Sequence, residues 1–465
     1  MQKHPSPRRA LSRRDFLKNT GLASGLLILP SGFLRGENAP SNRINVAGVG
    51  VTGMGRDDIN GARNAGGTLI GICDVESSYL AGAQHAYPEA RAFADYREMF
   101  DKIGKDIDAV LVSTPDHTHF TVAMTAVQLG KHVHVQKPLC RTVDQVRRLT
   151  KAAAEHKIVS QMGNQGHSNA HIRLVKEWYE AGLFGEINRI DTWTAQPLTK
   201  SKREGTDAYL PVKPVPKNLN WDLWLGPAAS RPYSEGLAPR QWRAYYDFGG
   251  GSLGDMAAHI FDAAYYVLDL GAPERIEFVE ASSKSPITFP ERCRLVYHFP
   301  ANAKRGPVKL AWSQGRGSSV KPPVPEGLHL PDGSGLARRQ SDGLTMSGSL
   351  FYGEKLTFNM GQYGDFFYTV PVERFAALKE KAPPQKYPRV KGSHYRNWLD
   401  AIRNGGKATS DFSYAGPLTE VIQLGVIAQR VGRSLNWDAK AGKFIGDDEA
   451  NALLVAAPAR DGFLA

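Results

Sequence analysis

The chain has 465 residues, of which 42% are hydrophobic and 22% charged, a composition typical of an ordinary globular protein large enough for two domains. Its formal net charge is +12, but residues 1–37 hold seven basic side chains against two acids, and the remaining excess forms no long basic run. This distribution argues against a polyanion-binding face, so we expect no nucleic-acid partner. Three cysteines are too few for a disulfide framework.

Residues 1–40 are predicted to be a signal segment and linker. Ser12–Lys18 contains an arginine pair typical of twin-arginine signals, and a short apolar stretch, Thr20–Leu29, follows it. The stretch is too short for a permanent membrane span. An ordinary amino-terminal helix with a chance arginine pair is the alternative. We predict recognition by the twin-arginine export machinery and a periplasmic or other extracytoplasmic location, and we expect no membrane span elsewhere.

Residues 41–163 alternate short apolar strands with amphipathic helices, which indicates parallel βαβ units. The pattern predicts an α/β fold with an N-terminal Rossmann doubly wound parallel sheet, whose ligands bind at the carboxyl ends of the strands. The predicted strands are 44–49, 68–73, 109–113, 132–135 and 159–163, and the clearest helices are 121–129 and 143–156.

The first of these strands runs into a glycine turn of the form Gly-x-Gly-x-x-Gly, which is informative because a helix can follow it. We expect Gly48 to permit the tight turn, Gly50 to let the backbone approach a pyrophosphate, and Gly53 to let the helix sit close to the sheet. The amino terminus of that helix would favour phosphate groups. A purely structural turn is the alternative interpretation.

Asp74 stands at the end of the second predicted strand. A carboxylate at this position accepts hydrogen bonds from the adenosine ribose and repels a 2′-phosphate, so the cofactor is predicted to be NAD, with NADP less favoured. A helix cap is the alternative role for Asp74.

The regular strand–helix alternation ends before residues 164–440. The pattern in this segment predicts an α+β domain with a mostly antiparallel open sheet. The predicted elements are a helix at 171–181, a strand at 185–193, a helix at 254–270, antiparallel strands at 275–281, 292–299 and 307–313, and return helices within 393–433. Segments 199–216 and 316–343 are predicted loops, and 441–465 is a C-terminal tail.

Two further motifs are Ser113–His119 (Ser-Thr-Pro-Asp-His-Thr-His) and Gly130–Leu139, which ends in Gln-Lys-Pro-Leu. Together with the glycine turn they resemble the glucose–fructose oxidoreductase and inositol dehydrogenase (Gfo/Idh/MocA) family. The resemblance implies that Thr114, Pro115 and His119 belong to the cofactor site. It also implies that Gln136 and Lys137 lie at the nicotinamide, with Lys137 before a proline that is commonly cis.

The sequence departs from the family pattern at Gln136, where the family usually has glutamate. Glutamine keeps hydrogen-bonding capacity but removes a charge. We therefore expect Lys137 to lack its usual neighbouring anion, which would change its pKa or its hold on a substrate hydroxyl.

A second chemical centre is predicted on the helix that follows a run of glycines at 249–251. Asp255 and His259 are four residues apart, so both lie on one helical face, where the carboxylate can orient the imidazole. The resemblance implies that His259 is the acid/base for a sugar hydroxyl, while Lys137 would stabilise the developing oxyanion. A capping acid beside a surface histidine is the alternative.

Gln165 and His167 follow the last strand of the first predicted domain, and the resemblance places substrate-facing residues there. We predict that both contact the substrate, and we predict no metal site.

These patterns predict an NAD(H)-dependent oxidoreductase that holds its cofactor tightly and acts on a secondary hydroxyl of a carbohydrate, either a sugar or a glycoside. An NAD-assisted glycoside hydrolase with no net redox is one alternative, and a non-catalytic sugar-binding protein on the same fold is another. The resemblance also implies a homo-oligomer.

Overall fold

The structure is a computed structural model that describes residues 43–195, 208–209, 211–316, 321–323, 325–326, 345–371 and 373–464. From Ile44 onward the chain forms one compact unit. The predicted signal segment 1–40 and most of the predicted loops at 199–216 and 316–343 lie outside the described residues.

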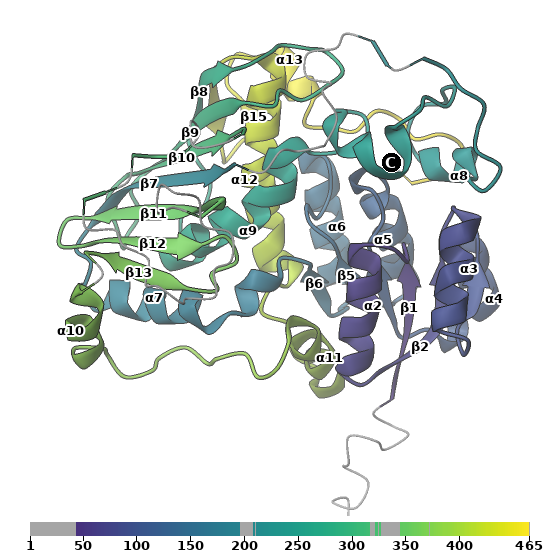
Figure 1. The fold of residues 1–465 in the computed structure, drawn as a ribbon, viewed down its shortest axis with the longest axis horizontal. Coiled ribbons are helices and arrows are strands. Elements are labelled where there is room, and N and C mark those ends of the chain that lie inside the picture. Colours follow the sequence, from purple (N-terminus) through teal and green to yellow (C-terminus); the bar gives the residue numbers. More distant parts are fainter. Residues whose placement is uncertain are drawn as a thin grey trace, which may run out of the picture. The chain divides into compact units, whose positions relative to one another are not determined.

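The first sheet is parallel throughout, with strand order β3-β2-β1-β4-β5-β6 (Figure 1). This order is that of a doubly wound dinucleotide-binding fold, which confirms the predicted Rossmann sheet. Its central strand β4 is apolar at every position, and β1 at all but one, as expected where helices cover both faces of a sheet. The strands are β1 (Ile44–Val49), β2 (Gly67–Cys73), β3 (Arg91–Phe93), β4 (Ala109–Val112), β5 (His132–Val135) and β6 (Ser160–Met162).

Polar side chains start several helices of this sheet by accepting backbone N–H groups that the first turn leaves unpaired. Glu76 caps the helix after β2, Asp95 the helix after β3, and Thr142 the helix after β5. The helices are α2 (Met54–Asn64), α3 (Ser77–Ala86), α4 (Tyr96–Ile103), α5 (His119–Gln128) and α6 (Val143–Glu155).

The second sheet has the order β13-β12-β11-β7-β10-β9-β8-β14-β15 among the described residues. All neighbours are antiparallel except β7 and β10, which confirms a mostly antiparallel sheet. Its strands are β7 (Ile187–Thr194), β8 (Arg275–Ala281), β9 (Cys293–Phe299), β10 (Val308–Gln314), β11 (Ser347–Gly353), β12 (Thr357–Gly361), β13 (Phe367–Val370), β14 (Leu435–Asp438) and β15 (Lys443–Phe444).

Two long helices, α9 (Gly251–Val267) and α12 (Phe412–Val431), pack against each other beside this sheet (Figure 1). Helix α12 contacts β8 and β9 of the second sheet as well as α6 and β6 of the first. One apolar cluster therefore includes side chains from both sheets, for example Val133 and Leu295. Helix α7 (Ala170–Glu180) packs on α9, and α11 (His394–Asn404) packs on α2.

The remaining helices are short: α8 (Trp221–Leu225), α10 (Arg374–Glu380) and α13 (Asp448–Ala452). Among the described residues, no helix is both long and apolar enough to cross a bilayer. The three cysteines are buried, free thiols.

Several predicted bounds need correction. Helix α9 begins at Gly251 and ends at Val267, three residues before each of the predicted bounds 254 and 270. Helix α12 contains Pro417 in its interior. The strands β11–β13 follow the predicted loop 316–343 and were not predicted, and neither were the short edge strands β3 and β15. Strands β3 and β15 have only three and two residues, too few to show an alternation.

Candidate active site

The glycine turn after β1 has the predicted glycines, but two of them have exchanged roles. Gly50 and Gly53 have positive φ values of 86° and 53°, which an L side chain rarely adopts. Gly48 lies inside β1, and a Cβ there would come within 2.9 Å of Ile59 on α2. Gly48 thus permits close packing of helix and strand, whereas Gly53 forms the turn.

Asp74 lies where predicted, at the end of β2, and its carboxylate is part of the turn's hydrogen bonding. It accepts from the backbone N–H of Val51 at 3.1 Å and from that of Glu76 at 3.0 Å. Burial raises the pKa of Asp74, against the lowering effect of these N–H groups. The two hydrogen bonds fix the carboxylate beside the glycine turn.

A cleft of about 800 Å³ opens at the carboxyl ends of the first sheet's strands. It is bounded on the other side by residues 216–243, including Trp224 and Trp242. Eight of the predicted site residues line it: Gly50, Gly53, Asp74, Thr114, Pro115, His119, Gln136 and Lys137. The predicted cofactor residues, apart from the buried Gly48, therefore share one cleft.

His119 joins two of the cleft's loops. Its buried ring lies between two carbonyl oxygens, with Nε2 2.9 Å from Thr114 O and Nδ1 2.8 Å from Pro138 O. Burial lowers the pKa of His119, so the ring is neutral at neutral pH and donates one hydrogen bond at a time. The Lys137–Pro138 peptide bond is cis, as the resemblance implied.

Lys137 has an anion beside it, which corrects the expectation drawn from the glutamine at 136. Its Nζ donates to Asp255 Oδ1 at 2.6 Å. Arg243 lies 3.4 Å from the same carboxylate oxygen and 3.1 Å from Asp116. Two cations and two anions thus alternate across the two domains, and the buried Asp116 also accepts from the backbone N–H of Gly250.

The positive charges of Arg243 and Lys137 keep Asp255 ionised. Burial alone would raise its pKa, but Arg243 and Lys137 outweigh that effect and hold the pKa of Asp255 well below its usual range. Asp255 is therefore an anion at neutral pH, and it fixes the position of the lysine ammonium group.

His259 lies one helical turn after Asp255 on α9, but the carboxylate is bonded to Lys137 rather than to the imidazole. The ring is buried, and its Nδ1 has no hydrogen-bond partner among the described residues. Burial and the charge of Lys137 lower the pKa of His259 to about 3. The predicted orientation of His259 by Asp255 is thus wrong. The imidazole is neutral, and neither His259 nor Asp255 is among the residues that line the cleft.

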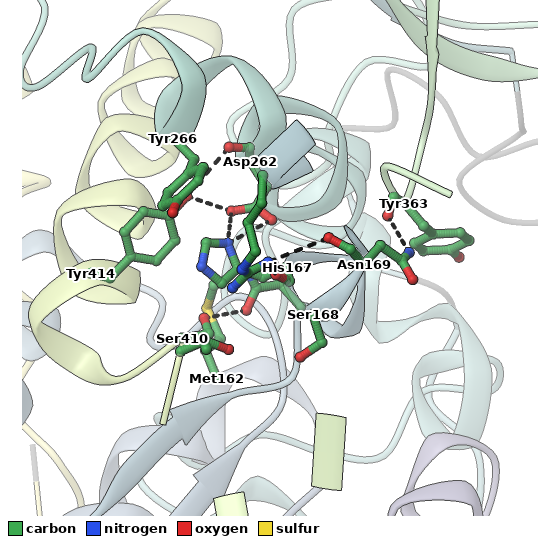
Figure 2. Close-up of polar contacts among 12 residues, drawn as sticks. Met162, His167, Ser168, Asn169, Asp262, Tyr266, Tyr363, Ser410 and Tyr414 are labelled. Carbon is green, nitrogen blue, oxygen red and sulfur yellow. Dashed lines mark hydrogen bonds and ion pairs between the residues drawn. The ribbon is translucent and has the colours of Figure 1, made fainter. Parts of the chain in front are cut away.

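The two predicted substrate residues lie in a short turn, η4 (Gln165–Ser168), and do not line the cleft. Gln165 Nε2 lies 3.5 Å from Tyr395 Oη. His167 is buried, and its Nδ1 lies 2.9 Å from Asp262 Oδ1, which also accepts from the Tyr414 hydroxyl at 2.6 Å. Figure 2 shows the Asp262 carboxylate bonded to both the His167 ring and the Tyr414 hydroxyl. Substrate contact by Gln165 and His167 stays a prediction.

Asp58 on α2 accounts for the glutamine at 136. Its fully buried carboxylate accepts from Gln136 Nε2 at 2.9 Å, Tyr395 Oη at 2.7 Å and Ser113 Oγ at 2.5 Å. A glutamate at position 136 would instead place a second carboxylate within about 3 Å of the first, where both cannot ionise without a large cost. The amide donor of Gln136 is therefore matched to Asp58.

Sequence reasoning missed three residues of the site. Asp116 stands inside the Ser113–His119 motif, and Arg243 follows Trp242 in a segment for which the sequence analysis proposed no site residue. Asp58 carries no motif, and its only signal is an acid on the apolar side of an amphipathic helix. The hydrogen-bond and ion-pair partners of all three residues are distant in sequence, so these pairs could not be predicted from the sequence alone.

Two segments of the chain match models of known protein families. Residues 44–164 match the model of the Gfo/Idh/MocA oxidoreductase family, NAD-binding Rossmann fold, and residues 169–299 match the model of that family's C-terminal alpha/beta domain. Among the described residues there is no group of three or more metal-ligating side chains.

Curated relatives match over less than half of their length. A levoglucosan dehydrogenase of Pseudarthrobacter phenanthrenivorans is 24% identical over 203 residues, which is 42% of this chain and 42% of the relative. A glycosyl hydrolase family 109 protein of Solibacter usitatus is 28% identical over 199 residues, 38% of this chain and 44% of the relative.

One similar solved structure is the WlbA dehydrogenase of Bordetella pertussis in complex with NADH and UDP-GlcNAcA, with a TM-score of 0.57 and 17% identity. The superposition covers 85% of this chain and 98% of that one. At this identity the likeness establishes the fold alone.

Proposed function

This chain belongs to the Gfo/Idh/MocA oxidoreductase family, and from this premise we propose that it is an NAD(H)-dependent oxidoreductase acting on a secondary hydroxyl of a sugar or glycoside. The observation that carries the proposal is the contact of Lys137 with Asp255. It joins a cleft lined by the dinucleotide residues to the helix that holds His259.

The residues present fit NAD. The turn at Gly50 and Gly53 and the start of α2 give a backbone surface suited to phosphate groups. Asp74 offers carboxylate oxygens for a ribose. Gln136 lines the cleft, and its buried Oε1 has no hydrogen-bond partner among the described residues. A carboxamide, which nicotinamide carries, is a suitable donor for such an orphan acceptor.

When bound, NAD⁺ accepts the hydride. Oxidation of a secondary alcohol breaks the C–H bond with its electron pair, and the hydroxyl proton must leave as the carbonyl forms. His259 is neutral, so its imidazole can accept that proton from a hydroxyl bound beside it. The Lys137 charge that lowers the pKa of His259 also lowers that of a hydroxyl bound beside it, which keeps the proton transfer feasible.

Lys137 holds the reacting oxygen, since its ammonium group favours the developing alkoxide. Asp255 fixes the lysine head group at 2.6 Å, and Arg243 shares the charge of Asp255. The pair is thereby positioned before substrate arrives, which lowers the cost of organising the site during reaction.

An NAD-assisted glycoside hydrolase is the second candidate, because one relative is a glycosyl hydrolase family 109 protein. In that scheme oxidation of a ring hydroxyl acidifies the neighbouring C–H, the glycosidic group is eliminated, water adds, and the hydride returns. The same Lys137 and His259 would serve its redox steps. The presence of both residues with Asp255 argues against the third alternative, a non-catalytic sugar-binding protein.

We further propose that the protein is exported by the twin-arginine machinery with its cofactor tightly held, and that it forms a homo-oligomer. The motif at Ser12–Lys18 supports the first point. Substitution of both Arg13 and Arg14 by lysine should keep the protein in the cytoplasmic fraction. Export of that variant at the wild-type level would refute the pathway, and a sizing measurement tests the oligomer.

The catalytic proposal is tested on the purified protein. After denaturation, released NAD(H) is assayed, and the native protein is then incubated with glycosides while nicotinamide absorbance and free-sugar release are followed. Reduction of bound NAD⁺ without aglycone release is expected for the oxidoreductase. Aglycone release without net NADH and without an added acceptor would instead support the hydrolase, and a protein that binds no nicotinamide would refute both.

A further inference from the structure

The last residues of the described chain lie at the cleft. Phe463 is one of the side chains that line it, together with Asp95 and Tyr96 after β3 and Thr121 on α5. Figure 1 shows the C-terminus beside α8, far from the tail's origin after α13. The segment 460–464, which we call the C-terminal strap, thus returns from the second sheet to the Rossmann domain.

The strap is attached to the first domain by contacts at three successive residues. Arg97 Nη1 donates to Gly462 O at 3.0 Å, and its guanidinium lies 4.4 Å from the centre of the Phe463 ring. The backbone N–H of Leu464 donates to Thr121 Oγ1 at 3.1 Å. Arg97 is itself fixed by the carboxylate of Asp95, with 2.6 Å between Nη2 and Oδ2.

The other end of the strap is attached to the segment that bounds the cleft on its second side. Arg460 Nε donates to Gly226 O at 2.9 Å, and its Nη1 pairs with Asp222 Oδ1 at 2.5 Å. The strap therefore links residues 216–226 to α4 and α5 across the cleft.

Residues 216–226, the cover segment, have their own attachment to the first domain. The backbone N–H of Ser77 donates to Asn218 O at 2.7 Å, and that of Asn220 donates to Val75 O at 2.9 Å. Trp224 O lies 2.9 Å from His117 Nε2. The cover segment thus crosses from the end of β2 to the loop after β4 and lies over the same end of the cleft as the strap.

This end of the cleft is the adenosine end. Asp74 marks the ribose position at the end of β2, and the residues after β3 lie next along the sheet. Ala94, Tyr96, Leu223 and Phe463 contribute apolar surface there, which suits a flat heteroaromatic ring.

We propose that the C-terminal strap closes the adenosine end of the cleft and controls exchange of the dinucleotide, so that NAD enters and leaves only when residues 460–464 detach. The inference rests on the proposed function, because it takes the ligand to be NAD. A gate of this kind slows both the association and the dissociation of NAD. The loss of a single contact with NAD would raise only the dissociation rate.

The test compares the full chain with a variant that lacks residues 460–465 and with Phe463→Ala. NADH is bound to each protein, and its fluorescence is followed on mixing and on displacement by excess NAD⁺. We expect the deletion to raise both the association and the dissociation rate by about tenfold or more. Phe463→Ala, which keeps the Arg460 and Leu464 attachments, should raise mainly the dissociation rate.

Asp461→Asn is the matched control, because Asp461 is an exposed residue of the strap, and its rates should equal those of the full chain. Thermal unfolding of each cofactor-free protein checks that the variants are folded. If the full chain binds NADH but both variants exchange it at the unchanged rate, the strap proposal is overturned and the proposed function stands. If the full chain binds no NADH, both are overturned.

Discussion

The two ends of the cleft are built differently. The nicotinamide end depends on alternating charges, Lys137, Asp255, Arg243 and Asp116, which come from both domains and are largely buried. The adenosine end depends on backbone hydrogen bonds to Asp74 and on a chain segment laid across it. The first arrangement sets protonation and charge, and the second controls access. Substitutions at one end should therefore change chemistry without releasing cofactor, and substitutions at the other should do the reverse.

The largest expected effect is at the nicotinamide end. His259→Ala removes the proton acceptor, and single-turnover hydride transfer should slow by about 10³-fold while bound NAD stays unchanged. His85→Ala, at an exposed histidine, is the control. Equal loss of cofactor and activity would show that the two ends are not separable.

Gln136→Glu tests the pairing of Gln136 with the buried Asp58 at the nicotinamide end. Two carboxylates would then share the site at Asp58, and we expect a loss of about 3 kcal/mol in the free energy of unfolding, measured in urea. The pKa of the introduced glutamate would be raised above its unfolded value. The folded state would then bind the extra proton, so the deficit should shrink as pH falls.

The double variant Asp58→Asn with Gln136→Glu is the control for that experiment, because it exchanges donor and acceptor. It should recover most of the lost stability. A single variant as stable as the wild type would contradict the matched pair.

At the adenosine end, Asp74→Ser should raise the dissociation constant of NAD by about tenfold and reduce discrimination against NADP, with little change in the hydride-transfer rate once cofactor is bound. Titration with both nucleotides measures the first effect, and saturating single turnover measures the second. Asp101→Ser, an exposed acid on α4, should change neither. A slower hydride-transfer step in Asp74→Ser at saturating cofactor would contradict the separation of the two ends of the cleft.

Per pH unit, the smallest expected effect is the acid sensitivity that His259 adds. Its pKa is about 3 in the folded chain against about 6.5 unfolded, so the unfolded state binds more protons between these values. Stability therefore falls as pH drops from about 6.5 towards 3, by at most about 1.4 kcal/mol per pH unit from this group.

His259→Gln should reduce that slope, measured by urea unfolding at several pH values. Some acid sensitivity should persist, because burial also lowers the pKa of His117, His119, His134 and His394. The exposed His156→Gln is the control. An unchanged slope in His259→Gln would show that folding does not lower the pKa of His259.

Local patterns were sufficient for five of the six strands of the first sheet and for the residues of the dinucleotide motif. The apolar strand at 44–49, the glycines and the acid at 74 all lie within one βαβ unit, where spacing along the chain determines position in space. The same patterns could not show that Asp255 pairs with Lys137 instead of His259. Both partners lie within reach of the carboxylate, and only the packing of α9 against the first domain decides between them.

Long-range contacts account for the other differences. Asp58 meets Tyr395 and Gln136 across 337 and 78 residues of chain, and the tail meets α5 across 343. A tail without periodicity gives no sign of docking, so 441–465 could only be predicted as an end segment.

Helix α12 limits how this protein can be recombined with its relatives. Although it follows both sheets in the chain, it packs on α6 and β6 of the first sheet as well as on β8 and β9 of the second. A fragment that stops near residue 164 would leave the α12-facing sides of α6 and β6 uncovered and prone to aggregation. A chimera that exchanges substrate domains would therefore have to carry residues 394–431 with the first domain, so the workable crossover points differ from the boundary between the two sheets.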